Sequence, residues 1–358
     1  MATESTTDFT LDSAAALAAE DQGEIEGKSP WALAWRRLRR NYVALGFLAL
    51  FIFIVVACLS AGLYADHVAH TGPNENHLGE TFPKDGEQVP VVSKGGFVNG
   101  EFIAGGIPVG PQLWHAGGRY FFGADNQGRD VAVRLLYGGR NSLMIGIGSA
   151  TICMFLALLT ALLAGYFGGK TDWIISRFFD LIWAFPVLLL AIALGTALSI
   201  NGFHHFGIDL ESGSLWIPTL VIAFVLIPYV GRPLRGQILS LREKEFIEAA
   251  TAQGASSFRV MLSELLPNIA SSALVLFTLI IASNILTEAG LSFLGAGVQP
   301  PNPSWGTLIA DGQGRIVTAP WLAIIPGVAI VLTVLSLNVF GDGLRDALDP
   351  RAKVRVEH

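Results

Sequence analysis

Long uncharged stretches interrupt the polar sequence of this chain at six places. None of these windows contains Asp, Glu, Lys or Arg: 43–63, 143–165, 181–200, 215–231, 269–287 and 321–340. A helix needs about 20 mainly apolar residues to cross the hydrocarbon core of a bilayer, and a charge at the centre of such a helix costs about 2.5 to 3.5 kcal/mol. The pattern therefore predicts an all-α membrane protein with six transmembrane helices.

The composition of the chain supports this interpretation. Of its 358 residues, 52% are hydrophobic and only 15% are charged, which is too apolar for an ordinary soluble domain. The first window begins at residue 43 and is longer than the apolar region of about 7 to 15 residues in a signal peptide, so we expect it to remain in the mature protein. Cys58 and Cys153 fall inside windows and are interpreted as small packing residues.

The positive charges indicate the orientation of the spans. Most of the 23 Lys and Arg residues lie before the first window, after the last one, or in the second and fourth of the five connecting segments. Because cytoplasmic segments of membrane proteins carry such an excess, both termini are predicted to face the cytoplasm. No basic patch interleaved with aromatic residues points to nucleic acid as a partner.

The windows divide the chain into five parts. We expect an acidic cytoplasmic tail, an interfacial basic segment with the first transmembrane helix, an extracytoplasmic insert, a core with five transmembrane helices, and a cytoplasmic C-terminal tail: 1–35, 36–63, 64–142, 143–345 and 346–358. The four arginines between residues 36 and 40 suit a helix on anionic membrane lipid, and a plain positive-inside anchor explains them equally well. In the insert, Asn99-Gly100 between apolar runs predicts a β-hairpin.

The stretch AGYFGGKT, residues 164–171, is close to a nucleotide-binding loop. The template G-x-x-x-x-G-K-[ST] fits at Gly169, Lys170 and Thr171, whereas Ala164 replaces the first glycine. A P-loop follows a β-strand and opens a helix. Here the motif follows an apolar window, and no apolar strand ending in Asp comes after it to hold magnesium. We interpret the stretch as a tight cytoplasmic turn.

The longest predicted cytoplasmic loop, 232–268, has the pattern of a helical hairpin. Leu241–Ala252 consists of good helix formers, and Gly254 is a natural stop. In the first helix, Phe246, Ile247, Ala249 and Ala250 are expected to form an apolar patch beside charged residues. A second short helix is predicted over Ser256–Leu266, ending at Pro267. Such a hairpin, projecting from a membrane bundle, fits a groove on a soluble partner; the alternative is a connecting loop that lies on the membrane surface.

Within this loop, Glu248-Ala249-Ala250 followed by Gly254 and Leu266-Pro267 resembles the EAA signature of importer permeases of the ATP-binding-cassette (ABC) class. Three further segments resemble the peptide, or peptide/nickel, subgroup of that class, specifically the second of its two permease subunits: FGADNQGRDVAVRLLYGGRNSL (122–143), EAGLSFLGAGVQPPNPSWG (288–306) and NVFGDGLRDALDP (338–350). The resemblance covers about residues 30–351 in matching order.

The resemblance implies the type I importer permease fold, in the bacterial plasma (inner) membrane. It implies four partners: a second permease subunit, two ATPase subunits and an extracytoplasmic substrate-binding protein. Because ATP and magnesium would bind the ATPase subunits, this chain is expected to be no enzyme and to hold no cofactor or metal. Its expected function is to form half of the path for peptides and to couple ATP hydrolysis to alternating access. Import of nickel or another small solute is the alternative within the family.

The candidate site residues form two groups. The resemblance implies that an ATPase subunit is contacted through the hairpin, at Phe246, Glu248, Ala249, Ala250, Gly254 and Ser256. Glu248 would bond to the partner, the two alanines would permit close approach, and Gly254 would allow the chain to reverse. Glu288, beside the outer end of the fifth window, and Asn284, one turn earlier, are candidates for the translocation path. A carboxylate with purely structural bonds is the alternative for Glu288.

Other classes of function find little support in the sequence. His67-x-x-His70 and the pair His204-His205 lack the cysteine or carboxylate spacing of a metal site, and no catalytic triad is apparent in the spans. An ion-driven secondary carrier would bury titratable groups at mid-membrane and show paired inverted repeats. The six windows contain no Asp, Glu, Lys, Arg or His, so such a carrier is the weaker alternative.

Overall fold

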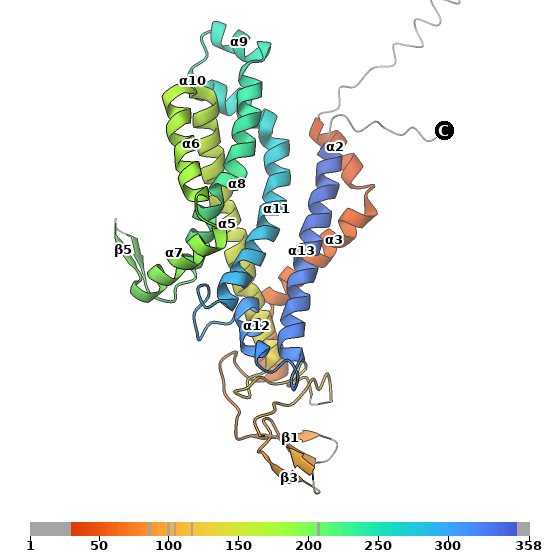
Figure 1. Ribbon diagram of the computed structural model, residues 1–358. Helices are drawn as coiled ribbons and strands as arrows, with labels where there is room; N and C mark the ends of the chain where they lie inside the picture. Colours follow the sequence, from red (N-terminus) through yellow and green to blue (C-terminus); the bar gives the residue numbers. More distant parts are fainter. Residues whose placement is uncertain are drawn as a thin grey trace, which may run out of the picture.

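The computed structural model describes residues 30–84, 87–98, 101–103, 105–115, 117–205 and 208–348. Its helices form an elongated bundle, shown in Figure 1. The α-helices are α2 (Pro30–Leu38), α3 (Tyr42–Leu59), α4 (Ala61–Tyr64), α5 (Val131–Phe167), α6 (Gly169–Trp183), α7 (Val187–Asn201), α8 (Trp216–Arg242), α9 (Glu245–Ala252), α10 (Ser257–Arg259), α11 (Leu266–Phe293), α12 (Trp305–Gln313) and α13 (Trp321–Leu348). Two π-helical segments are η1 (Ala65–Ala69) and η2 (Val260–Leu265).

Within the described ranges, the strands form three separate antiparallel hairpins. They are β1 (Thr81–Lys84) with β2 (Glu87–Pro90), β3 (Gly96–Val98) with β4 (Glu101–Ile103), and β5 (Phe203–His205) with β6 (Ile208–Leu210). The pairing of Val98 with Glu101 confirms the hairpin predicted around Asn99-Gly100, two residues that themselves lie outside the described ranges.

In the part of the chain that the structure describes, five helices are long and apolar enough to cross a membrane: α3, α5, α8, α13 and the continuous helix Ser257–Phe293. The pair α6 and α7 passes the same test together, as a helix bent by 85°. The prediction of an all-α membrane protein with six spans is therefore confirmed. One of the six, however, is a bent pair, and the window 181–200 lies across its bend.

Proline causes this bend. Pro186 stands directly before α7, and its ring removes a backbone donor and disfavours a helical conformation of the preceding residue, Phe185. By contrast, Pro228 and Pro326 lie inside α8 and α13, which continue through them. Helices in membranes tolerate such prolines because neighbouring groups satisfy the freed carbonyls.

The helix α5 is longer than its apolar window. It begins at residue 131 because the side chain of Asp130 caps it: Oδ1 accepts hydrogen bonds from the backbone N–H groups of Ala132 and Val133, at 2.8 and 3.2 Å. Asp130 is fully buried, and its Oδ2 also accepts from the N–H of Tyr120, at 2.6 Å. The carboxylate therefore fixes the end of the insert to the start of α5.

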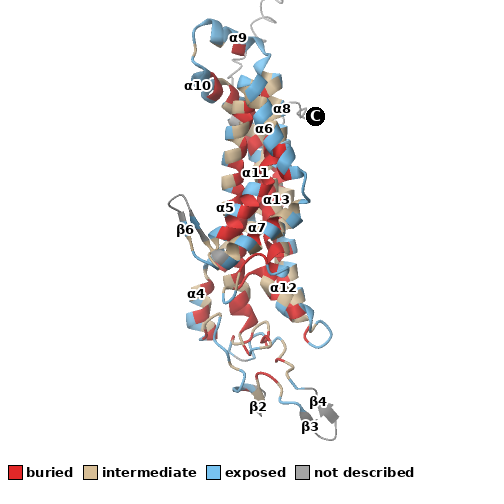
Figure 2. Ribbon diagram, turned by 60° about the vertical axis from the view of Figure 1, so that its left-hand side comes forward, coloured by how far each residue is buried: buried red, intermediate tan, exposed pale blue. Residues whose placement is uncertain are grey.

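The core of the bundle lies around α5, which packs against α8 and α11. Small residues line the buried face of α5, among them Ala150, Ala157 and Ala161, and meet larger buried residues of α8 such as Ile222 and Leu234. Apolar surface gains little from leaving lipid, so close approach of backbones at small residues is what holds membrane helices together. Figure 2 shows this buried zone running along α5 and α11.

The two ends of the bundle carry different elements. Figure 1 places α2, α9 and the end of α13 at one end, and α12 with the strands β1 to β4 at the other. The position of α2 and the end of α13 at the same end requires an even number of membrane crossings, and six spans satisfy this requirement. At the first end, Ala34 and Leu38 of α2 are buried, and Leu38 packs with Leu344 and Ala347 of α13.

The segment that resembles a P-loop is a turn between two helices. α5 ends at Phe167 and α6 begins at Gly169, with Gly168 and Gly169 both at positive φ. A P-loop needs a strand before its glycines, and here a helix of 37 residues takes that place. The interpretation as a tight turn is confirmed.

The ion pair between α6 and α8 generates a testable prediction. Arg235 contacts Asp172 through both Nε and Nη2, with Nη2 donating to Oδ2 at 2.5 Å, and both side chains are mostly covered. Asp172→Ala would leave the guanidinium without its partner, so we expect a loss of about 1 to 3 kcal/mol in the free energy of unfolding.

The exposed pair within α6 supplies the control. Arg177 lies 3.4 Å from Asp180, and its side chain is 66% exposed, so Arg177→Ala should cost less than about 0.5 kcal/mol. Thermal unfolding of the purified variants in detergent measures both changes. Equal shifts in the two variants would contradict the structural role of the pair between α6 and α8.

Candidate functional site

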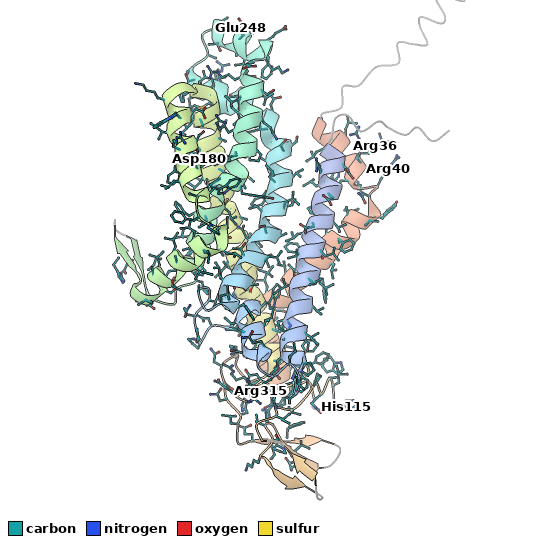
Figure 3. The ribbon with its side chains drawn as sticks, in the orientation of Figure 1. Arg36, Arg40, His115, Asp180, Glu248 and Arg315 are labelled. Carbon is teal, nitrogen blue, oxygen red and sulfur yellow. The ribbon has the colours of Figure 1, made fainter. Side chains whose placement is uncertain are left out.

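The helix α9 projects from one end of the molecule, where Figure 3 labels Glu248. The sequence predicts a single helix over Leu241–Ala252, and this is wrong: α8 continues to Arg242, and α9 starts only at Glu245. Lys244 adopts an extended conformation that turns the chain. The turn lays α9 across the end of the bundle, where Ile247 is only 4% exposed. Tertiary packing of Ile247 thus overrides the helix propensity of the segment.

Gly254 reverses the chain after α9. Its φ is +83°, a left-handed conformation that glycine adopts without the steric cost other residues incur. Two hydrogen bonds close the turn: the N–H of Gly254 donates to the carbonyl of Thr251 at 2.9 Å, and the N–H of Ala255 donates to that of Ala250 at 3.1 Å. This is the Schellman arrangement at a helix end, and it confirms Gly254 as the residue that ends the helix.

Ser256 starts the next helix. Its backbone is extended, and its Oγ accepts from the N–H of Arg259 at 3.4 Å, as an N-cap residue does. The prediction that this helix ends at Pro267 is wrong, because Ser257–Phe293 is one helix. In η2 the N–H of Leu266 donates to the carbonyl of Met261, five residues back. This wider π-type turn leaves Pro267 in the first turn of α11, where a proline is tolerated.

The surface of the hairpin combines aromatic rings with small and acidic side chains. Phe246 is 38% exposed and Phe258 is 67% exposed. Glu248 and Ala249 are exposed, and Ala250 is half-buried. Among the described residues, the Glu248 carboxylate forms no ion pair. Figure 2 shows the exposed surface of α9 and α10 at this end.

A groove of about 490 Å³ separates α9 from the end of α5; it is lined by Tyr166, Phe167, Arg242, Glu243, Lys244, Ile247, Glu248 and Thr251. The sequence groups Ile247 with Phe246 and the alanines in one apolar patch, but Ile247 faces the bundle. Phe258 is an exposed aromatic residue that the sequence analysis does not single out. The sequence feature that could have indicated its exposure is its position in the first turn after Ser256, which lies outside the EAA signature.

Glu288 and Asn284 lie on α11, deep inside the chain. Both are fully buried. Glu288 Oε1 accepts a hydrogen bond from the Ser292 hydroxyl at 2.7 Å, with Ser142 and Ser304 nearby, and the side-chain amide of Asn284 lies 2.7 Å from the Ser149 hydroxyl of α5. In this conformation neither side chain reaches a surface. Their assignment to a translocation path therefore stays a prediction.

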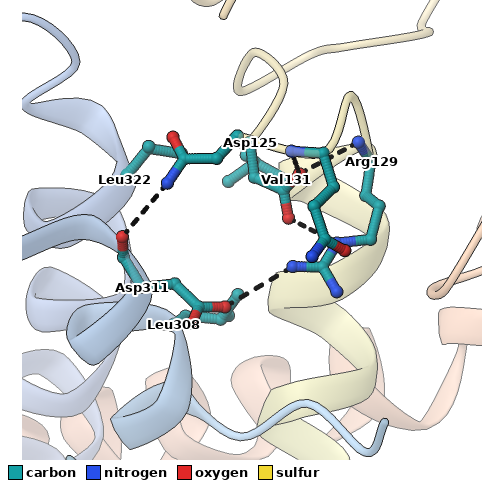
Figure 4. A pocket seen from close by; sticks show the side chains of 8 residues that line it. Asp125, Arg129, Val131, Leu308, Asp311 and Leu322 are labelled. Atoms are coloured by element: carbon teal, nitrogen blue, oxygen red, sulfur yellow. Dashed lines mark hydrogen bonds and ion pairs between the residues drawn. The ribbon is translucent and has the colours of Figure 1, made fainter. Parts of the chain in front are cut away.

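At the opposite end, four charged side chains join the insert to α12, and Figure 4 shows three of them: Asp125, Arg129 and Asp311. Arg129 Nε contacts Asp125 at 2.6 Å, and both Arg129 and Arg134 reach Asp311, at 3.5 and 3.6 Å. Asp125, Arg129 and Asp311 border a cavity of about 80 Å³. Burial raises the pKa of Asp311, while the two arginines oppose that shift. Two arginines pair with two carboxylates, so the charges of the cluster balance. We therefore interpret the cluster as a structural contact between the insert, α5 and α12, and not as a binding site for a charged ligand.

The described histidines do not gather into a metal site. Over the ranges that the structure covers, no group of three or more His, Cys, Asp or Glu side chains is placed to hold a metal ion. His77 bonds to the Thr71 hydroxyl at 2.8 Å and to the Glu80 carboxylate at 2.9 Å. The bond from His77 lowers the pKa of Glu80.

The spans and the projecting helical hairpin define a multi-pass membrane protein, and comparison with known proteins gives its family. A family model described as a binding-protein-dependent transport system inner membrane component matches residues 157–354. A second, described as the N-terminal TM domain of oligopeptide transport permease C, matches residues 29–81.

Full-length relatives match over most of the chain. The dipeptide transport system permease protein DppC of Alkalihalophilus pseudofirmus is 36% identical over 326 residues, 91% of this chain and 91% of that protein. The glutathione transport system permease protein GsiD of Pectobacterium atrosepticum is also 36% identical over 326 residues, 91% of this chain and 93% of that protein. A chain of the inward-facing MetNI methionine ABC transporter has a TM-score of 0.49 at 18% identity, covering 60% of this chain and 96% of that chain.

This chain belongs to the family of binding-protein-dependent transport system inner membrane components, the permease subunits of ABC importers. The resemblance seen in its motifs is thereby confirmed. The relatives are permease subunits and are not themselves enzymes.

The buried carboxyl group of Glu288 gives a second prediction. Glu288→Ala would open a cavity and remove the acceptor of the Ser292 hydroxyl, so we expect a loss of about 2 to 4 kcal/mol in the free energy of unfolding. Glu288→Gln keeps the volume and an acceptor, and should lose less than half as much. Thermal unfolding in detergent compares the two. An alanine variant that is fully stable but inactive in transport would instead place Glu288 in the path.

Proposed function

We propose that this chain is the permease subunit of an ATP-driven importer of short peptides. The relatives named above transport a dipeptide and glutathione according to their names, and these solutes share the chemistry of a short peptide. The chain forms half of the translocation path together with a second permease subunit. An extracytoplasmic binding protein delivers the peptide, and two ATPase subunits bind ATP and magnesium.

The α9 hairpin is the contact with the ATPase subunit. One observation carries this assignment: an exposed helix with the EAA residues continues, through the turn at Gly254, into a helix that runs unbroken to Phe293. Displacement of α9 by a partner is therefore transmitted along α11 without an intervening flexible loop. On the other side, α9 joins α8 through the extended residue Lys244, which permits α9 to move relative to α8.

Coupling requires that the ATPase distinguish two conformations of the permease. A partner shifts a conformational equilibrium only by its difference in affinity for the two states. Moving a population from 1:99 to 99:1 needs about 5.5 kcal/mol, which closure of the ATPase subunits around ATP supplies. The buried contacts of α5 with α8 and α11 then determine which helices move together.

The hairpin end faces the cytoplasm of a bacterial inner membrane in this proposal. The loop 232–268 holds five of the basic residues, and α2 with the following turn adds four arginines at the same end. This excess of positive charge is typical of the cytoplasmic side. The insert then faces the binding protein, and both chain termini are cytoplasmic.

Two substitutions in the hairpin test the coupling role. Gly254→Pro cannot adopt the positive φ of the turn, and Glu248→Arg reverses the charge on the exposed face of α9. We expect each to reduce ATP-dependent peptide uptake at least tenfold, while the amount of protein in the membrane stays unchanged. Uptake into proteoliposomes that contain the whole importer measures the effect.

Glu211→Arg is the matched control, because Glu211 is also an exposed glutamate but lies in the connection between β6 and α8. It should transport normally. Normal uptake by both hairpin variants would refute the coupling assignment. Transport by this chain alone in liposomes, without ATPase subunits, would refute the importer itself.

A further inference from the structure

A strained loop in the insert presents two apolar side chains to the outside. Leu113 and Tyr120 both have positive φ, at 52° and 53°, a conformation that residues other than glycine rarely adopt. Hydrogen bonds hold this backbone: the N–H groups of Gln112 and Leu113 donate to the carbonyls of Tyr120 and Phe121, each at 3.1 Å. Such strain persists only where the surroundings enforce it. We call residues 112–115 the Trp114 loop.

The constraint exposes a tryptophan. The Trp114 side chain is 69% exposed and Leu113 is 49% exposed. One edge of the indole is supported by the ring of Phe121, with centroids 5.3 Å apart, and Phe121 contacts Phe122 at 4.9 Å. Within the described ranges the indole N–H has no acceptor. An apolar ring with a free polar N–H suits a boundary between water and hydrocarbon.

The Trp114 loop is fixed to the outer end of the first span. The hydroxyl of Tyr64 donates to the carbonyl of Gly118 at 2.9 Å, and Leu59 and Leu63, just before Tyr64, are each 66% exposed. Gly118 has a φ of +92°, and a Cβ there would lie 2.5 Å from Val68, so only glycine permits this approach. In Figure 3, His115 lies beyond the end of the helices, between Arg315 and the strands β1 and β3 of Figure 1.

An apolar groove continues this surface into the spans. Phe122, at the end of the aromatic row, lines a groove of about 390 Å³ together with residues of α3 and α13 such as Phe53, Ala57, Ile324 and Val328. These residues belong to membrane-spanning helices. An apolar groove between two spans that leads through Phe122 and Phe121 to an exposed tryptophan matches the outer half of a bilayer and its headgroup boundary.

We propose that the Trp114 loop inserts into the headgroup region of the outer leaflet and anchors the insert to the membrane, with a phospholipid acyl chain in the adjoining groove. Tryptophan is enriched at this depth of membrane proteins because its ring is apolar and its N–H remains hydrated. The anchor requires only that the chain spans a membrane, and is independent of the peptide and of the ATPase subunits. It fixes the height of the insert above the bilayer, where a binding protein has to dock.

Depth-dependent quenching tests the proposal on the full chain in lipid vesicles. Cys58 and Cys153, both buried, are replaced by alanine, and Trp114→Cys is labelled with an environment-sensitive fluorophore. Gln88→Cys is the matched control, because Gln88 is also exposed but lies on the strand β2, beyond the end of the helices. Nitroxide-labelled phosphatidylcholine reports contact with lipid, and iodide reports contact with water.

We expect nitroxide lipid to quench the label at position 114 at least threefold more than the label at position 88, with iodide showing the opposite order. Equal iodide quenching at the two positions would overturn the proposal, because the loop would then lie in water. Protection of position 114 from both quenchers would also overturn it, since another protein surface would then cover the loop.

Discussion

Backbone hydrogen bonding in hydrocarbon obliges each span to remain helical, and in this chain it produces one helix that runs without a break from the turn at Gly254 to Phe293. The exposed end of that helix is the α9 hairpin, and its far end holds Glu288 in the core beside α5. A force applied at the hairpin therefore acts on the centre of the bundle. The contacts between the other helices determine which of them would move together with α11.

Those contacts differ between the two ends. Near the hairpin, α6 and α8 are joined by the pair of Asp172 and Arg235, and the chain passes from α8 to α9 through the extended Lys244. At the other end, the cap at Asp130 and the charged cluster of Arg129 and Asp311 hold the insert and α12 to α5. The insert end is cross-linked by polar groups that include the buried Asp125, Asp130 and Arg134, and the loss of buried polar groups costs more than that of exposed ones.

Much of this architecture follows from the sequence, because the cost of burying charge in lipid acts on every residue of a span. The six windows, the hairpin predicted around Asn99-Gly100 and the stop at Gly254 each follow from a local rule. The structure has a membrane-length helix or bent helix pair for each window, paired strands on both sides of Asn99-Gly100, and a turn at Gly254. Pro186 and Pro267 show that a local rule does not always predict where a helix ends. Pro186 ends a helix and Pro267 does not, because η2 supplies a wider turn before Pro267 that no feature of a single residue announces.

Burial was harder to predict than helix position. Ile247 lies in the expected apolar patch of the hairpin but packs inward, and Phe258, outside the signature, is the more exposed ring. Glu288 follows directly after an uncharged window, which suggests a place at the outer boundary, yet the folding of the segment before α12 over it leaves it fully buried. These outcomes depend on contacts between residues far apart in the chain, which periodicity does not contain.

Electron spin distances across the assembled importer test the central claim most directly. One pair of spin labels on α9 and α11, at Ala249 and Leu286, and a second pair on α9 and α13, at Ala249 and Val331, would be compared with and without ATP. If α9 and α11 move as one body, the first distance stays constant while the second changes on nucleotide binding. A first distance that changes while the second stays constant would contradict the account, because the hairpin would then flex without moving the span.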